Sequence, residues 1–159
     1  MYVDKNLVCS GAAALSESGT TISGQTVTGT NTSVLSTDSI DLRQNRDIGE
    51  GSDIFGRFQV ITAASGGTSV EFQVIAADDG ALSSNVAVIG STGAIPVASL
   101  TAGARFACSV NPRLASKGQR YVGLRYVLVG AVAAGAYFGD LGIEVQDGAK
   151  FYPSGFAVL

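Results

Sequence analysis

The segment FQVITAASGGTSVEFQV, residues 58–74, decides the fold class. At both of its ends, apolar and polar residues alternate, as in Phe58-Gln59-Val60 and again from Val70 to Val74. Because successive side chains of a β-strand point to opposite faces, this alternation predicts two strands that each have a buried and an exposed face. Between them, Ser65-Gly66-Gly67-Thr68 supplies glycines that accept a positive φ. The segment therefore predicts a β-hairpin.

The same period of two recurs along the chain. Tyr121–Val129 is expected to be the longest and most central strand, with Arg125 on the face opposite to Val122, Leu124, Tyr126 and Leu128. Further strands are predicted at 87–90, at 106–110 with Phe106, Cys108 and Val110 on one face, and at 143–147. They are bounded by the turn or breaker sequences Asp78-Asp79-Gly80, Ser91-Thr92-Gly93 and Asn111-Pro112.

Helical patterns are weak throughout the sequence. The best candidate, Ala131–Phe138, contains Gly135 and has no N-cap residue, and it falls in a Gly-rich connection with Gly130 and Gly139. Val97–Leu100 could form one turn at most. Many short strands without a convincing helix indicate an all-β antiparallel sandwich or barrel.

The length of 159 residues suits one domain with one core, so residues 1–159 are expected to fold together. Residues 10–37 form a tract of Ser, Thr, Gly and Ala that has no charged residue except Glu17. Ile22, Gln25, Val27 and Val34 give the tract some strand character, so it is either a hairpin or extended segment lying on the domain or a mobile arm. Residues 148–159 form a short C-terminal tail.

Charge and hydropathy bear on partners and location. The net charge is −3 and the ten basic residues are scattered, so we expect no nucleic acid partner. We expect no membrane partner either, because no stretch approaches the 18 apolar residues of a membrane span. The N-terminus lacks a signal-peptide pattern, so we expect a chain made and kept in a cytoplasm. Cys9 and Cys108 are expected to be two free thiols rather than one disulfide.

The residues needed for common catalytic sites are missing. The chain has no His, and it has none of the nucleophile-elbow, phosphate-loop or zinc-knuckle motifs, so we expect no enzyme, no catalytic residue and no cofactor. Gly49-Glu50-Gly51 only superficially resembles a nucleotide loop and is interpreted as a turn. A paired-carboxylate glycosidase is disfavoured because the chain has no Trp to form a sugar platform.

Acidic residues cluster between positions 38 and 53, at Asp38, Asp41, Asp47, Glu50 and Asp53. Such oxygen-rich clusters can hold calcium, but this order departs from the EF-hand pattern. Arg43, Arg46 and Arg57 lie among or next to the carboxylates. We therefore expect a local salt-bridge network or a partner-facing charged edge in preference to a metal site.

Several segments together resemble the Bbp16-type capsid cement proteins of tailed bacteriophages. The segments that carry the resemblance lie in the same order and spacing over most of residues 38–147 and at the N-terminus, and they are Tyr2–Leu7, Ser39–Leu42, Arg46–Gly51, Gly66–Phe72, Ile95–Phe106 and Arg120–Tyr126. The chain departs from the pattern in its longer tract at 10–37 and in its tail at 151–156.

The resemblance implies a jelly-roll-like β-sandwich that sits outside the shell of major capsid protein as a homo-oligomer, a dimer or a trimer. It implies a decoration protein of the virion surface that is assembled in the bacterial host cytoplasm and that reinforces contacts between capsomers without catalysis. Its partner-binding residues stay unassigned. The alternative is a phage tail or fibre module that binds carbohydrate in one version, for which Tyr121, Tyr137 and Tyr152 are the candidate aromatic platforms.

Overall fold

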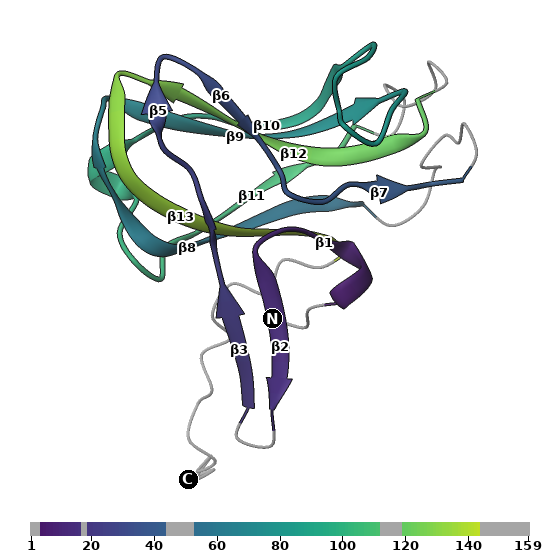
Figure 1. Cartoon of the computed structure of the whole chain (residues 1–159), viewed down its shortest axis with the longest axis horizontal. Helices are drawn as coiled ribbons and strands as arrows, with labels where there is room; N and C mark the ends of the chain where they lie inside the picture. The colour runs from purple at the N-terminus through teal and green to yellow at the C-terminus, as the bar shows by residue number, and fades with distance from the viewer. Residues whose placement is uncertain (1–3, 17–18, 44–52, 112–118, 144–159) are drawn as a thin grey trace, which may run out of the picture.

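A computed structural model describes residues 4–16, 19–43, 53–111 and 119–143 of the chain. The described residues form antiparallel strands with two short 3-10 turns, and the strands build two packed sheets and one projecting hairpin (Figure 1). The expected all-β antiparallel sandwich is therefore confirmed. Part of the strand at 143–147, the motif at 49–51 and the tail at 148–159 lie outside the described residues.

The first sheet is built around two long strands, β8 (Phe55–Gly66) and β13 (Ala131–Gly142), which pair with each other. The edge strand β11 (Arg105–Ser109) pairs with the other side of β8. Along the far side of β13 lie three short strands, β1 (Val8–Ser10), β4 (Gln25–Thr26) and β5 (Gly29–Thr30). A 3-10 turn, Lys5–Leu7, precedes β1 and begins with Asp4 as its N-cap.

The second sheet has the order β10 (Ala87–Pro96), β9 (Ser69–Ala77), β12 (Tyr121–Val129) and β6 (Ser33–Leu35). The short strand β7 (Ile40–Asp41) also pairs with β12, beyond the end of β6. A 3-10 turn at Val97–Ser99 follows β10, as the single turn expected there. The interior position of β12 is confirmed, but β12 is not the longest strand, since β8 and β13 each have 12 residues.

The predicted hairpin at 58–74 is wrong in its pairing, although the turn and both strands are in the expected places. β8 belongs to the first sheet and β9 to the second, so the turn at Gly66 and Gly67 carries the chain across the sandwich. Both strands still alternate, because each has one face toward the common core. The turn at Gly130 does the same between β12 and β13.

Two further expectations are corrected. The helix candidate at 131–138 is part of β13, whose glycines and alanines accommodate register shifts along the pairing with β8. The sequence at 91–93 does not end a strand, because β10 continues to Pro96 after a register shift between Ser91 and Ala94. Gly93 has a φ of +70° at this irregularity, a conformation that glycine adopts without strain.

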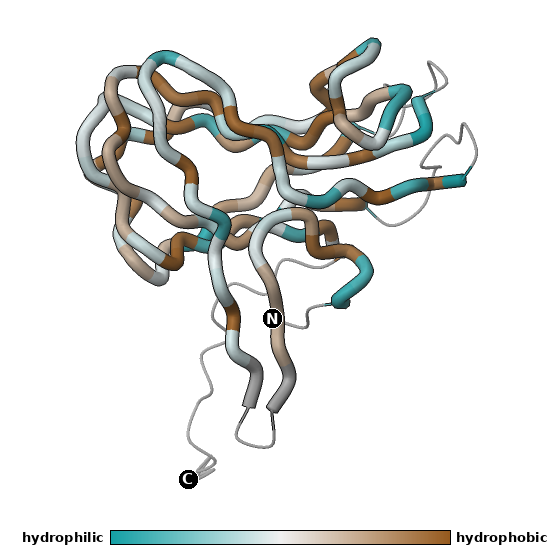
Figure 2. Tube along the Cα trace, viewed as in Figure 1, coloured by the Kyte–Doolittle hydropathy of each residue, from teal (hydrophilic) through white to brown (hydrophobic). Residues whose placement is uncertain are grey.

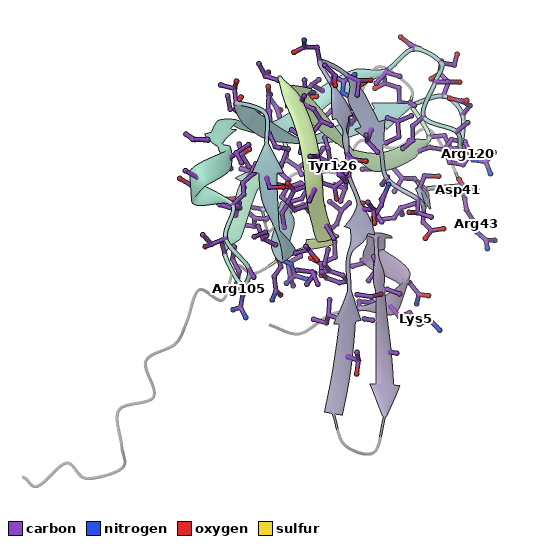
Figure 3. The ribbon with its side chains drawn as sticks, turned by 60° about the vertical axis from the view of Figure 1, so that its left-hand side comes forward. Lys5, Asp41, Arg43, Arg105, Arg120 and Tyr126 are labelled. Carbon is purple, nitrogen blue, oxygen red and sulfur yellow. The ribbon has the colours of Figure 1, made fainter. Side chains whose placement is uncertain are left out.

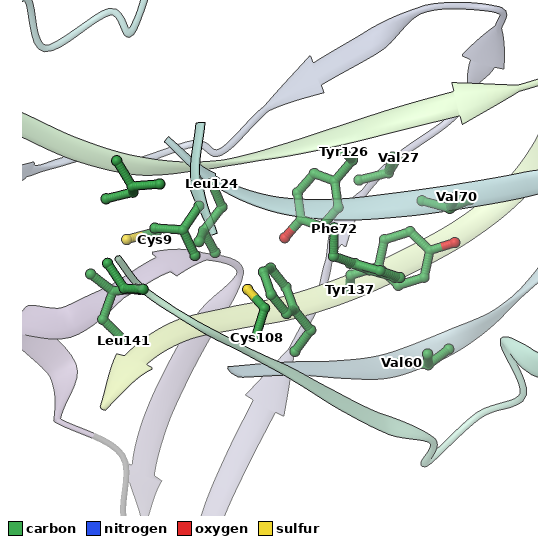
Figure 4. Close-up of a cluster of buried hydrophobic side chains, with 14 of the residues drawn as sticks. Cys9, Val27, Val60, Val70, Phe72, Cys108, Leu124, Tyr126, Tyr137 and Leu141 are labelled. Atoms are coloured by element: carbon green, nitrogen blue, oxygen red, sulfur yellow. The ribbon is translucent and has the colours of Figure 1, made fainter. Parts of the chain in front are cut away.

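The core lies between the two sheets and has an aromatic centre (Figure 4). Phe72 of β9 contacts the rings of Phe58, Tyr126 and Tyr137, with ring centroids 5.0 to 5.6 Å apart. The predicted faces of β12 are confirmed, since Val122, Leu124, Tyr126 and Leu128 are all buried in this core. Cys108 and Val110 are buried and Phe106 is half-buried, so the predicted face of β11 is confirmed as well.

Candidate partner-binding surfaces

The most prominent surface feature is a hairpin that projects away from the sandwich (Figure 1). It consists of β2 (Ala12–Ser16) and β3 (Gly19–Ser23), and within the described chain these strands pair only with each other. Ala12, Ala14, Thr21 and Ser23 are exposed. Figure 2 shows that polar or weakly hydrophobic residues predominate along the hairpin, with less of the strong hydrophobicity found in the sandwich strands.

The base of this hairpin is closely fitted between Gly11 and Gly24. A Cβ at Gly11 would lie 2.1 Å from the carbonyl oxygen of Ser23, and Gly11 has a φ of +79°. A Cβ at Gly24 would lie 2.9 Å from the backbone nitrogen of Tyr137 in β13. The two glycines therefore let the chain leave the sandwich and return to it at nearly the same point.

The chain after the hairpin is fastened to the sandwich. The Oε1 atom of Gln25 accepts hydrogen bonds from the Ser10 hydroxyl at 2.8 Å and from the Thr37 backbone at 3.0 Å. Its Nε2 atom donates to the Leu35 carbonyl at 2.7 Å. Val27 is fully buried in the core. The described part of the tract at 10–37 thus combines a projecting hairpin with short extended strands that lie on the domain.

A second candidate surface is a polar ladder across the outer face of the second sheet. Arg125 Nε of β12 donates to Gln73 Oε1 of β9 at 2.8 Å, and Gln73 Nε2 donates to Glu71 Oε1 at 2.6 Å. The Ser91 hydroxyl of β10 donates to the same Glu71 oxygen at 2.6 Å. The hydrogen bonds from Ser91 and Gln73 lower the pKa of Glu71. The ladder thus links the charged side chains of Arg125 and Glu71 through Gln73.

The other end of the same outer face is covered by the loop at 78–86. Leu82 lies over Gly123 of β12, where a Cβ would come within 2.3 Å of Leu82 Cδ1, and it buries Ile75 and Ala77. Asp79 accepts hydrogen bonds from the backbones of Ser83 and Ser84, both at 2.8 Å, so the predicted turn here begins a longer capped loop. This half of the face is therefore closed by the chain itself.

Of the carboxylate cluster predicted at 38–53, the structure describes Asp38, Asp41 and Asp53. Asp41 and Arg120 form a bidentate ion pair (Figure 3). Arg120 Nε lies 2.6 Å from Asp41 Oδ1, and Arg120 Nη2 lies 2.6 Å from Asp41 Oδ2. This pair lowers the pKa of Asp41 to about 2. Arg57 instead pairs with Asp140 of β13, which is fully buried. Arg46, Asp47 and Glu50 lie outside the described residues, and the described part of the chain has no group of His, Cys, Asp or Glu side chains placed to hold a metal ion.

The tyrosines proposed as platforms differ in their exposure. Tyr137 is fully buried in the core, so its assignment as a platform is wrong. Tyr121 is half-buried, and the Arg120 guanidinium lies 5.2 Å from its ring centroid. Tyr152 lies outside the described residues. Of the described candidates, Tyr121 alone has a partly exposed ring.

The two cysteines are buried free thiols, as expected. Burial, with a smaller contribution from nearby Asp140, raises the pKa of Cys9 to about 12. Burial raises the pKa of Cys108 to about 11. Since the thiolate is the nucleophilic form, neither cysteine is activated for chemistry.

Comparison with known families agrees with the resemblance in the sequence. The model of the family described as Bbp16 matches residues 22–140, which is more than half of the chain. The chain belongs to the Bbp16 family. The match begins within β3, so in this Bbp16 protein the first strand of the projecting hairpin precedes the matched region. No curated protein matches the chain.

The Bbp16 match covers most of the sandwich. The sequence alone did not identify any partner-binding residue. The glycines at 11 and 24 are the only local signal for the ends of the hairpin, because residues 12–23 show no regular alternation of apolar and polar residues. The polar ladder has no comparable local signal, because Ser91, Glu71 and Arg125 come from three different strands. Among the described residues, no helix is long and apolar enough to cross a membrane.

Proposed function

We propose that this Bbp16 protein is a capsid cement protein, a decoration protein that binds the outside of an assembled phage head and reinforces contacts between capsomers without catalysis. Its partners would be the major capsid protein and further copies of itself, and its location the outer surface of the virion after assembly in the bacterial host cytoplasm. The jelly-roll connectivity belongs to the same proposal. Family membership supports it, and the observation that carries it is the projecting hairpin.

A two-stranded hairpin is at best marginally stable on its own in water. The hairpin of β2 and β3 extends beyond the sandwich, and within the described chain its outer edges have no strand partner. Unpaired backbone N–H and C=O groups along such edges can pair with a strand of another chain. A neighbouring protein surface would therefore stabilise this hairpin, which makes it the first candidate for contact with the shell.

A cement site formed where several shell subunits meet exists only after assembly. Each contact can be weak, because simultaneous engagement of several sites by an oligomer raises the overall affinity by orders of magnitude. The protein should therefore be a homo-oligomer in solution, and it should bind assembled shells in preference to unassembled subunits. No cofactor or nucleic acid is needed for this role.

The test uses a variant in which the hairpin is removed at its base. Because a Cβ at Gly11 would lie only 3.2 Å from Gly24 Cα, residues 12–23 can be replaced by a short Gly-Ser link without moving the sandwich. Deleting the whole tract at 10–37 would be less informative, since it removes buried Val27 and the contacts of Gln25. We expect the shortened protein to keep its melting temperature and to lose most of its co-sedimentation with shells.

The control compares the two candidate surfaces, because Arg125→Ala alters the polar ladder and leaves the hairpin intact. The shortened variant should bind shells much more weakly than this control. Equal binding by the wild type and the shortened variant would remove the hairpin from the proposal. Light scattering should show an oligomer, and a strict monomer that pellets with neither shells nor loose subunits would favour the alternative of a tail or fibre module.

A further inference from the structure

The outer face of the second sheet is covered at one end by the loop at 78–86 and is open at the other end. On the open half, Val129 of β12 is 46% exposed and Val127 beside it is half-buried. Ser33 of β6 and Ala94 of β10 lie on either side and are exposed. In Figure 1 this face lies on the side of the sandwich opposite to the projecting hairpin. Short side chains of this kind let a second sheet approach closely.

The polar ladder on this open half leaves hydrogen-bonding atoms of both its charged groups unused. Glu71 accepts two hydrogen bonds through Oε1, and Arg125 donates one through Nε. Within the described chain, Glu71 Oε2 and the two Nη atoms of Arg125 make no hydrogen bond. Gln73 lies between the two groups and holds both, so their remaining atoms are already positioned for a partner.

The register of β9 and β12 determines how these two charges are arranged. Arg125 pairs with Gln73 and Val127 pairs with Glu71, so Arg125 and Glu71 are diagonal neighbours on adjacent strands. Diagonal neighbours lie about 7–8 Å apart. A two-fold axis that runs parallel to the sheet between these residues would bring Arg125 of one copy opposite Glu71 of a second copy, and it would form this pair twice. Val127 lies near the same axis and would meet Val127 of the second copy.

We propose that a second copy of this chain packs on the open half of this face, with Arg125 of each copy paired with Glu71 of the other. The inference rests on the self-association in the proposed function and assigns a surface to it. A second copy fits this face because one positive and one negative group make it complementary to itself. The hairpin, on the opposite side of the sandwich, stays available for contact with the shell.

Two charge reversals and their mixture test the pairing in the full-length protein by sedimentation velocity. Arg125→Glu and Glu71→Arg each place like charges opposite each other twice, so each should weaken the dimer by about 100-fold or more. An equimolar mixture should form a heterodimer with an affinity close to that of the wild type, because each contact then joins opposite charges. Arg125→Ala adds no repulsion and should weaken the dimer less. Arg105→Glu, at an exposed position of the first sheet, is the matched control and should leave the dimer unchanged.

Cross-linking gives a second readout that does not depend on a charge reversal being tolerated by the fold. Val127→Cys changes a half-buried residue near the proposed axis to another small side chain, and both native cysteines are buried. A short bismaleimide should link two copies of this variant. Val129→Cys, two positions further along β12 and away from the axis, should be linked much less. Equal linking of the two variants would contradict the placement of the axis.

The outcomes separate this inference from the proposed function. A dimer that is insensitive to both reversals, or a mixture that stays monomeric, would overturn the assigned surface and leave the role of the hairpin to the co-sedimentation test. A monomeric wild type or an oligomer with an odd number of copies would also overturn it, because a two-fold contact joins copies in pairs. A dimer that behaves as expected but does not bind shells would count against the cement function alone.

Discussion

Gly67 and Gly130 lie back to back where the chain twice crosses from one sheet to the other. A Cβ built on Gly130 would come within 2.9 Å of Gly67 Cα, and the Thr68 backbone N–H donates to the Val129 carbonyl at 2.7 Å beside them. Both glycines have positive φ, +70° at Gly67 and +81° at Gly130. The two sheet-crossing turns therefore pack on each other, and this contact leaves no space for a side chain.

The first prediction concerns this contact. Gly130→Ala should lower the free energy of unfolding through both backbone strain and overlap with Gly67. Gly103→Ala is the control, because Gly103 has a φ of +86° but no atom within 4 Å of a Cβ. In the control, the free energy of unfolding should fall by about 1–2 kcal/mol because of backbone strain alone. In Gly130→Ala, the free energy of unfolding should fall by roughly a further 1–3 kcal/mol because the new methyl group overlaps Gly67. Equal losses in denaturant titrations would show that the close contact has no energetic weight.

The faces of β12 give a second prediction. Leu124→Ala removes fully buried methyl groups from the core and should cost about 2–5 kcal/mol. Arg125→Ala, on the opposite face, removes the hydrogen bond to Gln73 and should cost less than about 1.5 kcal/mol. Thermal and denaturant unfolding of both variants would check the order, and the reverse order would contradict the facing of this strand.

A third prediction concerns the hydroxyl of Tyr137. Within the described structure this buried oxygen has no hydrogen-bonding partner, and burial raises the pKa of Tyr137 to about 12. Tyr137→Phe removes the unpaired polar group and keeps the ring, so stability should be unchanged or rise by as much as about 1 kcal/mol. Half-buried Tyr121→Phe is a suitable comparison. A clear loss of stability for Tyr137→Phe would mean that the hydroxyl makes a stabilising bond.

The buried pair of Arg57 and Asp140 gives a fourth prediction. Arg57 Nε donates to Asp140 Oδ1 at 3.0 Å, and both residues are buried. Asp140→Ala leaves a buried cation without this partner and should cost about 3–5 kcal/mol. Replacing both residues by apolar ones, Arg57→Met with Asp140→Leu, should recover much of that loss. Additive losses in the double variant would show that the two side chains do not act as a pair.

The fifth prediction concerns the stability of the fold at acid pH. Arg120 holds the pKa of Asp41 at about 2, below its ordinary value, so the contribution of this ion pair is complete above about pH 4. It is lost as the pH falls toward 2, because protonated Asp41 no longer favours the folded state. The stability difference between the wild type and Asp41→Asn should therefore shrink between about pH 4 and pH 2 in denaturant titrations. A difference that stays constant over this range would contradict the assignment.

Local alternation was enough to predict the strands and their inner faces, as in β11 and β12. It could not predict which sheet each strand joins, because the turn at Gly66 and Gly67 is equally suited to a hairpin and to a crossing between sheets. The glycines of β13 were misread for a related reason. A Cβ at position 139 would lie 2.4 Å from Leu124 Cδ1, so the packing requires glycine there. Leu124 is distant from Gly139 in the sequence, so local patterns do not reveal this requirement.

The partner-binding surfaces were harder to predict for the same reason. The acidic cluster suggested local ion pairs, yet Asp41 pairs with Arg120 and Arg57 with Asp140, 79 and 83 positions away. Sequence proximity is a weak guide to such pairs, because strands bring together residues from opposite ends of the chain. The ends of the hairpin were partly predictable, since Gly11 and Gly24 flank it.

The pairing of β1 with β13 also has a consequence for synthesis. Val8 pairs with Asp140, so 132 residues must be made after Val8 before its partner exists. At typical rates of about 5–20 residues per second, that strand waits roughly 7–26 s on the ribosome. During this time the first sheet lacks β13, the strand that lies between β1 and β8. The nascent chain is therefore most exposed to aggregation just before translation reaches β13, when rapid completion of the chain or cover by a chaperone protects it best.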